Sequence, residues 1–146
     1  MNVLPNYSEA EWLSTLKPYQ SSSIEILLEK DNEEAVVDIW LSSEGATLRS
    51  PFGGSRRDDP YVKRFIEKFK KEFRDFICGG EKYEGERESI SGFQGDAKTY
   101  IVSIMSSSLA VVLGSSAAYL APVIVVMLIA VSKMGVNAWC SLEDNS

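Results

Sequence analysis

The feature that most constrains this chain is a run of 34 residues, from Thr99 to Ser132, without a single charged side chain. A helix rises about 1.5 Å per residue, so about 20 apolar residues are enough to cross a hydrocarbon core about 30 Å thick. The run therefore predicts a membrane protein, and it is longer than one straight span requires.

Aromatic residues in and beside the run help to choose between one span and two. Tyr100, Tyr119 and Trp139 are separated by 19 and 20 residues, and Tyr and Trp prefer the level of the lipid headgroups. A separation of about 20 helical residues matches one hydrocarbon thickness, which places the chain at an interface three times. Turn-forming residues at Gly114–Ser116 and Pro122 mark the middle interface. We therefore expect a transmembrane helical hairpin rather than one tilted helix with a buried tail.

Small residues form a stripe along the first predicted span. Ala110, Gly114 and Ala118 recur every four residues, and Ser103 and Ser107 continue nearly the same face. Such stripes let helix backbones approach closely in membranes. The pattern indicates helix packing, either between subunits or inside one hairpin. We take these five residues as candidate pore-lining or helix-packing positions.

Lys133 is the one charged residue inside the second predicted span, and it precedes Trp139 by 6 residues. This separation is about 9 Å of helical rise, so the long side chain can snorkel to the interface. Alternatively, Lys133 lines a water-filled path or pairs across subunits, as intramembrane ionisable residues often do.

The sequence before the run predicts a small α+β domain. Ser8–Glu11 has the capping-box pattern that starts a short helix. Apolar and polar residues alternate over 24–28 and again over 35–41, which predicts a β-hairpin. Residues 46–49 are predicted as a third strand, which completes an antiparallel meander.

The clearest helix covers residues 58–78, with Pro60 in its first turn and Gly79 just beyond its end. Apolar residues three or four apart lie on one face of this helix, which we expect to cover the sheet as core. These residues are Val62, Phe65, Phe69, Phe73 and Phe76.

Basic residues cluster on and before this helix, because 8 of the 15 lie between Arg56 and Arg74. One interpretation is a solvated surface with ion pairs at i, i+4 spacing. A second is attraction to anionic lipid headgroups. The third is capture of a phosphate-bearing ligand, with backbone amides of the loop at 51–57 beside guanidinium groups. The candidate phosphate- or nucleotide-binding residues are Arg56, Arg57, Lys63, Arg64, Lys70 and Lys71.

The predicted organisation is a cytoplasmic α+β domain over 1–80, a flexible polar linker over 81–98, the transmembrane hairpin over 99–141 and a short acidic tail over 142–146. Of the 15 basic residues, 14 precede the apolar run. Because positively charged segments stay in the cytoplasm, we expect the amino-terminal domain on the cytoplasmic side of the inner membrane.

Composition excludes several classes of function. The net charge of −6 argues against duplex DNA binding, and the absence of histidine removes Ser-His-Asp and Cys-His catalytic systems. We find no Walker loop, dinucleotide fingerprint or zinc spacing, so no enzyme, cofactor or metal is expected. Cys78 and Cys140 are too few for a disulfide framework, and we expect them to be reduced thiols.

Two functions fit these features. The first is a homo-oligomeric membrane effector whose cytoplasmic domain controls an ion-conducting pore formed by the hairpins. The alternative is a membrane-anchored adaptor or scaffold that binds a protein partner and uses the hairpin as an anchor.

The layout of a small charged domain followed by terminal apolar helices resembles the membrane effectors of bacterial antiphage systems, such as Hailong-type channel subunits. This resemblance is one of architecture. It implies a homo-oligomeric channel that depolarises the membrane in antiviral defence. It also implies regulation by a nucleotide or oligonucleotide made by a partner enzyme, with the segment from Arg56 to Arg74 as the place to look for that ligand.

Overall fold

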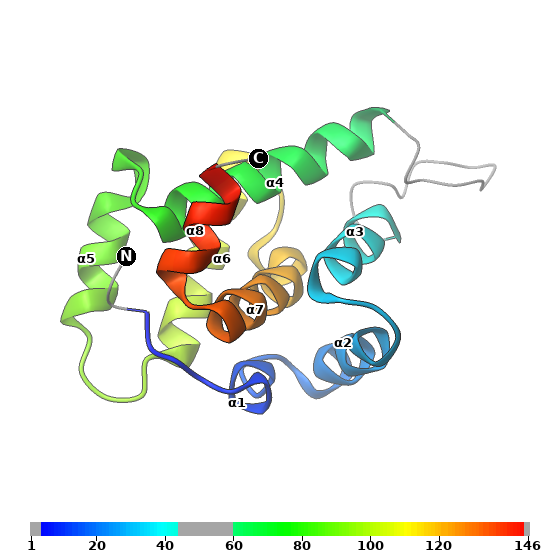
Figure 1. Ribbon diagram of the computed structural model, residues 1–146, viewed down its shortest axis with the longest axis horizontal. Coiled ribbons are helices and arrows are strands. Elements are labelled where there is room, and N and C mark those ends of the chain that lie inside the picture. The colour runs from blue at the N-terminus through cyan, green and yellow to red at the C-terminus, as the bar shows by residue number, and fades with distance from the viewer. Residues whose placement is uncertain (1–3, 44–59, 145–146) are drawn as a thin grey trace.

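The computed structural model describes residues 4–43 and 60–144, and all regular structure in these two ranges is helical (Figure 1). In chain order the elements are α1 (Glu9–Leu13), α2 (Pro18–Lys30), α3 (Glu33–Ser43), α4 (Pro60–Cys78), the short 3-10 helix η3 (Glu81–Tyr83), α5 (Glu84–Gly92), α6 (Lys98–Leu113), α7 (Ala117–Met134) and α8 (Val136–Asp144).

Helix α7 lies at the centre of this arrangement (Figure 1). It packs against α6 and α3 most extensively and also contacts α1, α2 and α8. Helix α4 crosses the other side of the molecule, where it contacts α3, α6 and α8. The described part of the chain is therefore an all-helical arrangement built around its most apolar helix.

The predicted α+β fold is wrong, since residues 24–28 lie in α2 and residues 35–41 lie in α3. The predicted third strand at 46–49 lies outside the described residues. Over so short a stretch, alternation also matches a helical face. Ile24 is fully buried and Leu27 is partly buried, which is the i, i+3 spacing of one side of a helix.

Local signals support helix rather than strand in this region. Pro18 occupies the first turn of α2, where its fixed φ angle suits a helix. Asn32 precedes α3 and accepts a hydrogen bond from the backbone N–H of Ala35, at 2.9 Å, through its Oδ1. Both features are typical of helix starts. The alternation of apolar residues favoured strands instead, and that prediction gave these features no weight.

Other predicted helices are confirmed. The capping box at the start of α1 is present, with Ser8 and Glu11 each bonding the other's backbone N–H. The apolar stripe of α4 is core, as expected, although it covers other helices instead of a sheet. Val62, Phe69, Phe73 and Phe76 are buried, and Phe65 is partly buried.

The segment 81–98, predicted as a flexible polar linker, contains η3 and α5. Helix α5 packs against α6, and η3 packs against α4. Tyr83, Ile90 and Ala97 are buried, so this segment contributes three side chains to the core.

The helix–turn–helix within the apolar run has its turn at the predicted place. Gly114 ends α6 in the left-handed conformation, with φ 68°, which favours glycine. Ser116 then starts α7 by accepting a hydrogen bond from the N–H of Tyr119 through its hydroxyl. We call α6, this turn and α7 the apolar hairpin.

Pro122 interrupts the hydrogen bonding of α7 near its start. A proline has no N–H, so the carbonyl four residues earlier, that of Ala118, loses its helical donor. The buried side chain of Gln20 on α2 donates to this carbonyl through Nε2 at 3.3 Å. One polar side chain therefore satisfies the group that the proline leaves unpaired, and it ties α2 to α7.

Candidate functional site

Helix α7 is the part of the described chain most suited to a membrane. Its 18 residues make it the one described helix long and apolar enough to span a bilayer, with a length of about 27 Å. Helix α6 is also apolar, but it has 16 residues. The side chains of α7 from Val123 to Ile129 are buried, so the helix is enclosed by other helices of the same chain. We call this arrangement of helices the closed domain.

The three aromatic residues expected at membrane interfaces have partners within the domain. Tyr100 stacks on Phe93, with ring centroids 4.4 Å apart. Tyr119 donates to the carbonyl of Leu41 at 3.4 Å through its hydroxyl. Trp139 is buried. Their spacing in the sequence is therefore compatible with packing inside an all-helical domain.

Lys133, near the end of α7, forms ion pairs with two other helices. Its Nζ lies 2.7 Å from a carboxylate oxygen of Glu33 on α3 and 3.6 Å from one of Glu9 on α1. The Lys133 side chain is more than half exposed. The single charge of α7 thus joins α1, α3 and α7 at an exposed surface, whereas the sequence pattern predicted a membrane interface or a water-filled path.

A partly buried hydrogen bond lies next to this ion-paired group. Trp12 of α1 is fully buried, and its indole N–H donates to the Ser132 hydroxyl at 2.9 Å. The ring of Tyr7 packs edge-on against Trp12, with centroids 5.1 Å apart. The short helix α1 is therefore fixed to the end of α7 by an aromatic anchor and an ion pair.

A cleft of about 620 Å³ opens beside Lys133, between α3, α4, α7 and α8. Its apolar lining includes Met127, Met134 and Leu142, and its polar lining includes Glu33 and Glu34. Lys70 and Lys133 also line it. Two of the predicted site lysines, one from the basic cluster and one from the apolar run, thus meet in one cleft.

Lys70 spans this cleft from α4. Its Nζ lies 3.1 Å from Glu34 Oε1 and 3.0 Å from Asp38 Oδ1. Partial burial lowers the pKa of Lys70, but the hydrogen bonds and charges of Asp38 and Glu34 outweigh that effect, and the net shift is upward. Lys70 therefore stays charged and holds α4 to α3.

The other candidate phosphate-binding residues are not gathered into this cleft. Lys71 pairs with Asp75 on the surface of α4, while Lys63 and Arg64 are exposed on the same helix. Arg56 and Arg57 lie outside the described residues. The four candidates that the structure describes do not converge on one pocket.

Most of the small-residue stripe is exposed in the closed domain. Ser103, Ser107, Gly114 and Ala118 face solvent, whereas Ala110 is buried. The stripe is therefore mainly on the outside of the apolar hairpin and does not form the contact between α6 and α7.

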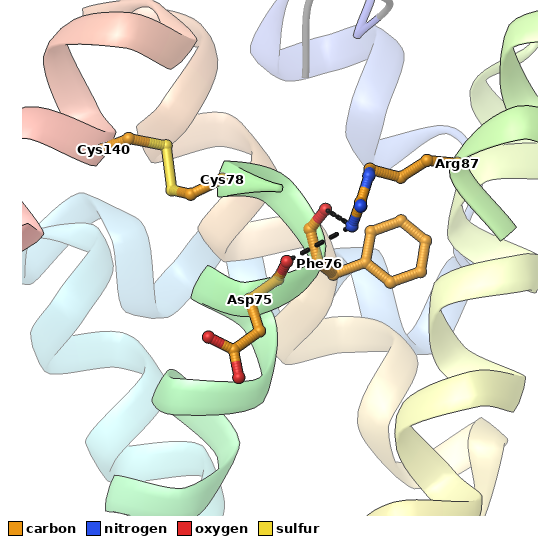
Figure 2. The surroundings of a disulfide bond; sticks show 5 residues. All are labelled: Asp75, Phe76, Cys78, Arg87 and Cys140. Atoms are coloured by element: carbon orange, nitrogen blue, oxygen red, sulfur yellow. Dashed lines mark hydrogen bonds between the residues drawn. A yellow bond between two sulfur atoms is a disulfide. The ribbon is translucent and has the colours of Figure 1, made fainter. Parts of the chain in front are cut away.

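A disulfide between Cys78 and Cys140 links α4 to α8 (Figure 2), with their Cα atoms 5.8 Å apart. The expectation of reduced thiols is therefore wrong for this form of the protein. The residue before Cys140, Trp139, packs edge-on against Phe73 of α4, with centroids 5.6 Å apart. Helix α8 is thus fixed across α4 by a covalent bond and an aromatic contact while it packs on α7.

The end of α4 that carries Cys78 is held in place by Arg87 of α5. The guanidinium donates to the backbone carbonyls of Asp75 and Phe76, at 3.4 and 3.2 Å (Figure 2), and to that of Gly80 at 2.6 Å. Asp75 and Phe76 belong to the last turn of α4, whose carbonyls lack the usual helical donors. The Asp75 carbonyl also accepts a hydrogen bond from the backbone N–H of Gly80. Arg87 therefore stabilises the carboxyl-terminal end of α4, which carries Cys78.

A buried carboxylate supports the same end of α4. Glu72 accepts hydrogen bonds from the hydroxyl of Tyr83 at 2.6 Å and from Lys82 Nζ at 3.0 Å. Burial raises the pKa of Glu72, but these two donors outweigh it and leave the pKa below its usual value. Burial and the bond to Glu72 raise the pKa of Tyr83.

No sequence pattern identified the groups that hold the helices together, which are Glu9, Glu33, Gln20 and the cysteine pair. One signal was present, because a lone lysine in an apolar helix calls for an acidic partner. Which of the 21 acidic residues supplies it depends on the folded arrangement. Pro122 gave a similar signal, because it leaves a carbonyl without a donor.

Comparison with protein-family models, curated proteins and solved structures gives no match. In the described residues, the fold and site define an all-helical arrangement with an enclosed helix of membrane-spanning length. The residues that enclose this helix carry the functional proposal.

Proposed function

We propose that the protein is a membrane effector that stores its apolar hairpin in a closed helical domain, inserts it into a bilayer and assembles there into an ion-conducting pore. The proposal is carried by one observation about α7. This helix is long and apolar enough to span a membrane, yet it is packed among α1, α2, α3, α6 and α8. To enter a bilayer, an enclosed helix of this kind exchanges its protein neighbours for lipid.

The contacts that close the domain differ in how readily they open. Lys133 pairs with Glu33 and Glu9 near the surface, and exposed ion pairs contribute about 0–1 kcal/mol each. The disulfide between Cys78 and Cys140 holds α8 covalently and opens only on reduction. We therefore propose that the thiol–disulfide state of this pair controls release of the apolar hairpin.

The proposed location follows from charge and redox conditions. The basic residues before the hairpin favour a cytoplasmic position for residues 1–98 at the inner membrane. In the cytoplasm, thiol–disulfide exchange with reduced thiols breaks the Cys78–Cys140 bond, leaves both cysteines as thiols and converts the donor thiols to a disulfide. The exchange frees α8 and favours the inserted form. Oxidation favours the closed form.

The exposed face of α6 is suited to contacts between inserted copies. Ser103 and Ser107 already lie on the outside of the closed domain, and Val111 on the same side is 84% exposed. Small and hydroxyl side chains favour close packing of helices in lipid. In the proposed pore this face meets neighbouring copies.

An adaptor function is the second candidate, and one surface feature favours it. A groove of about 610 Å³ lies between α2, α3 and the start of α7, lined by Tyr19, Ile26, Leu27 and Trp40 among others. An apolar groove of this kind suits an amphipathic helix from a protein partner. In that case the apolar hairpin stays in the core.

Release of a self-quenched dye from anionic liposomes distinguishes the two functions. Purified full-length protein should release little dye when oxidised and much more after reduction. Ser107→Asp tests insertion, because the position is exposed in the closed domain but a charge at the centre of a bilayer helix costs about 2.5–3.5 kcal/mol.

Ser22→Asp, at an exposed position of α2, is the matched control. We expect Ser107→Asp to keep the folded stability of the parent and to lose most of the dye release, while Ser22→Asp retains both. Equal release from reduced protein and buffer alone would refute the pore and favour the adaptor.

A further inference from the structure

The amino-terminal half of α4 exposes a band of mainly positive charge. Between Pro60 and Lys71, four basic residues and one acidic residue are exposed. The apolar residues of the same turns, such as Val62 and Phe69, are buried on the opposite side of the helix. Helix α4 is therefore amphipathic, with its basic side in water. The exposed charged residues are Lys63, Arg64, Lys68 and Lys71, with Glu67 among them.

Three of these cations form no ion pair with any other described residue. Lys71 pairs with Asp75, whereas Lys63, Arg64 and Lys68 have no carboxylate partner in the described part of the chain. We call these three residues the basic face of α4. Arg64 and Lys68 are four residues apart, a spacing at which like charges destabilise a helix. Their charge therefore does not stabilise α4, and it is available for a contact outside the molecule.

Other exposed surfaces of the described chain are mainly acidic. On α2 and the turn after it, three acidic residues and one lysine are exposed, and the same holds for η3 with α5. The whole chain has a net charge of −6. A negatively charged surface therefore repels these parts of the molecule and attracts the basic face of α4. The amino-terminal end of α4 extends outward at the edge of the molecule (Figure 1), where an extended flat surface can approach it.

We infer that the basic face of α4 docks the closed domain on a bilayer that contains anionic lipids. Each basic residue near such a surface strengthens binding about fivefold. A bilayer is the anionic partner that the rest of the chain favours, because α7 is long and apolar enough to span one. The inference rests on the proposed function and specifies the class of lipid that first meets the protein. Docking precedes reduction of the disulfide and leaves the apolar hairpin enclosed.

The test is co-sedimentation of the oxidised full chain with vesicles of phosphatidylcholine, with and without phosphatidylglycerol. Wild-type protein should bind the anionic vesicles and not the neutral ones, and binding should weaken as salt rises. Arg64→Gln with Lys68→Gln should bind about 30-fold more weakly, because two cations are lost from the docking surface. Lys17→Gln with Lys30→Gln is the matched control at exposed positions before and in α2. It removes the same charge and should bind like wild type.

A substitution that strengthens binding separates docking from loss of structure. Glu67→Gln removes the acidic residue that lies among the cations of α4, and it should bind anionic vesicles about fivefold more tightly. Glu25→Gln, at an exposed position of α2, changes the net charge equally and should leave binding unchanged. A misfolded variant does not produce a gain that is limited to one of two matched changes. Circular dichroism checks the folding of every variant.

Two results with vesicles would overturn the inference. These are equal binding of the oxidised wild type to neutral and anionic vesicles, and equal binding of the Arg64, Lys68 double variant and its control. A single-stranded oligonucleotide that binds through Arg64 and Lys68, without binding of anionic vesicles, would overturn it as well and assign the face to nucleic acid.

Dye release after reduction, measured separately on the same vesicles, keeps docking and pore formation apart. Docking of the oxidised protein without dye release from the reduced protein would refute the pore and support the docking surface. Dye release that is the same for wild type and for Arg64→Gln with Lys68→Gln, from vesicles that the oxidised protein does not bind, would refute the docking surface and leave the pore.

Discussion

Reduction of the Cys78–Cys140 disulfide should destabilise the closed domain by an amount that follows from its position in the chain. The bond joins residues 62 apart. Closing a loop of that length removes about 14 cal/mol/K of entropy from the unfolded chain, or about 4 kcal/mol at 25 °C. The folded-to-unfolded ratio should therefore fall by about three orders of magnitude on reduction.

Urea unfolding followed by circular dichroism, with and without reductant, measures this difference. With a slope of about 2 kcal/mol per molar urea, the midpoint should fall by about 2 M. The variant Cys78→Ser with Cys140→Ser should unfold like the reduced wild type and should not respond to reductant. A change in the wild type below about 1 kcal/mol would refute the reasoning that the bond constrains the chain.

Three further predictions concern the contacts around α7 and α4. Gln20→Ala should cost about 1 kcal/mol, the net contribution of a typical hydrogen bond, and much less in a Pro122→Ala background, where the backbone N–H of residue 122 again bonds Ala118. Equal costs in a double-mutant cycle by urea unfolding would contradict this. Trp12→Phe should lose about 1 kcal/mol in the same assay, because its hydrogen bond to α7 disappears. Because the pKa of Glu72 is lowered in the folded protein, its ionised form adds to the free energy of unfolding above the unfolded pKa near 4.5, and this stabilisation is lost as pH falls through the folded pKa. The free energy of unfolding should therefore decline less steeply between about pH 5 and 2 in Glu72→Gln than in wild type. Parallel pH curves for the two proteins would contradict this role of Glu72.

The sequence was sufficient for the elements whose signals are local. The capping box at Ser8 and Glu11, the apolar stripe of α4 and the turn at Gly114 each depend on residues a few positions apart, and each is present. The prediction of strands over 24–28 and 35–41 was wrong, because a short alternation of apolar and polar residues fits both the two-residue period of a strand and the 3.6-residue period of a helix.

The candidate site depended on contacts that no local pattern encodes. Lys133 meets Glu9 and Glu33, which lie more than 90 residues away in the chain. The disulfide joins Cys78 to Cys140, and two isolated cysteines give no indication of such proximity. The uncharged run likewise does not tell an enclosed helix from one in lipid, since both exclude charge for the same reason.

The central claim is that α7 leaves the helical domain and enters a bilayer, and the depth of a fluorophore on this helix tests it most directly. In the Cys78→Ser, Cys140→Ser background, a single cysteine replaces Ala130, which lines the cleft, and carries an environment-sensitive dye. A second protein carries the dye at the exposed Glu29 of α2 as the control.

We predict that anionic liposomes shift the emission of the Ala130 dye to the blue and that quenchers in the lipid tails suppress it, while the Glu29 dye remains in water. An Ala130 dye that keeps its aqueous spectrum and escapes the tail quenchers would contradict the proposal that α7 is a stored membrane span.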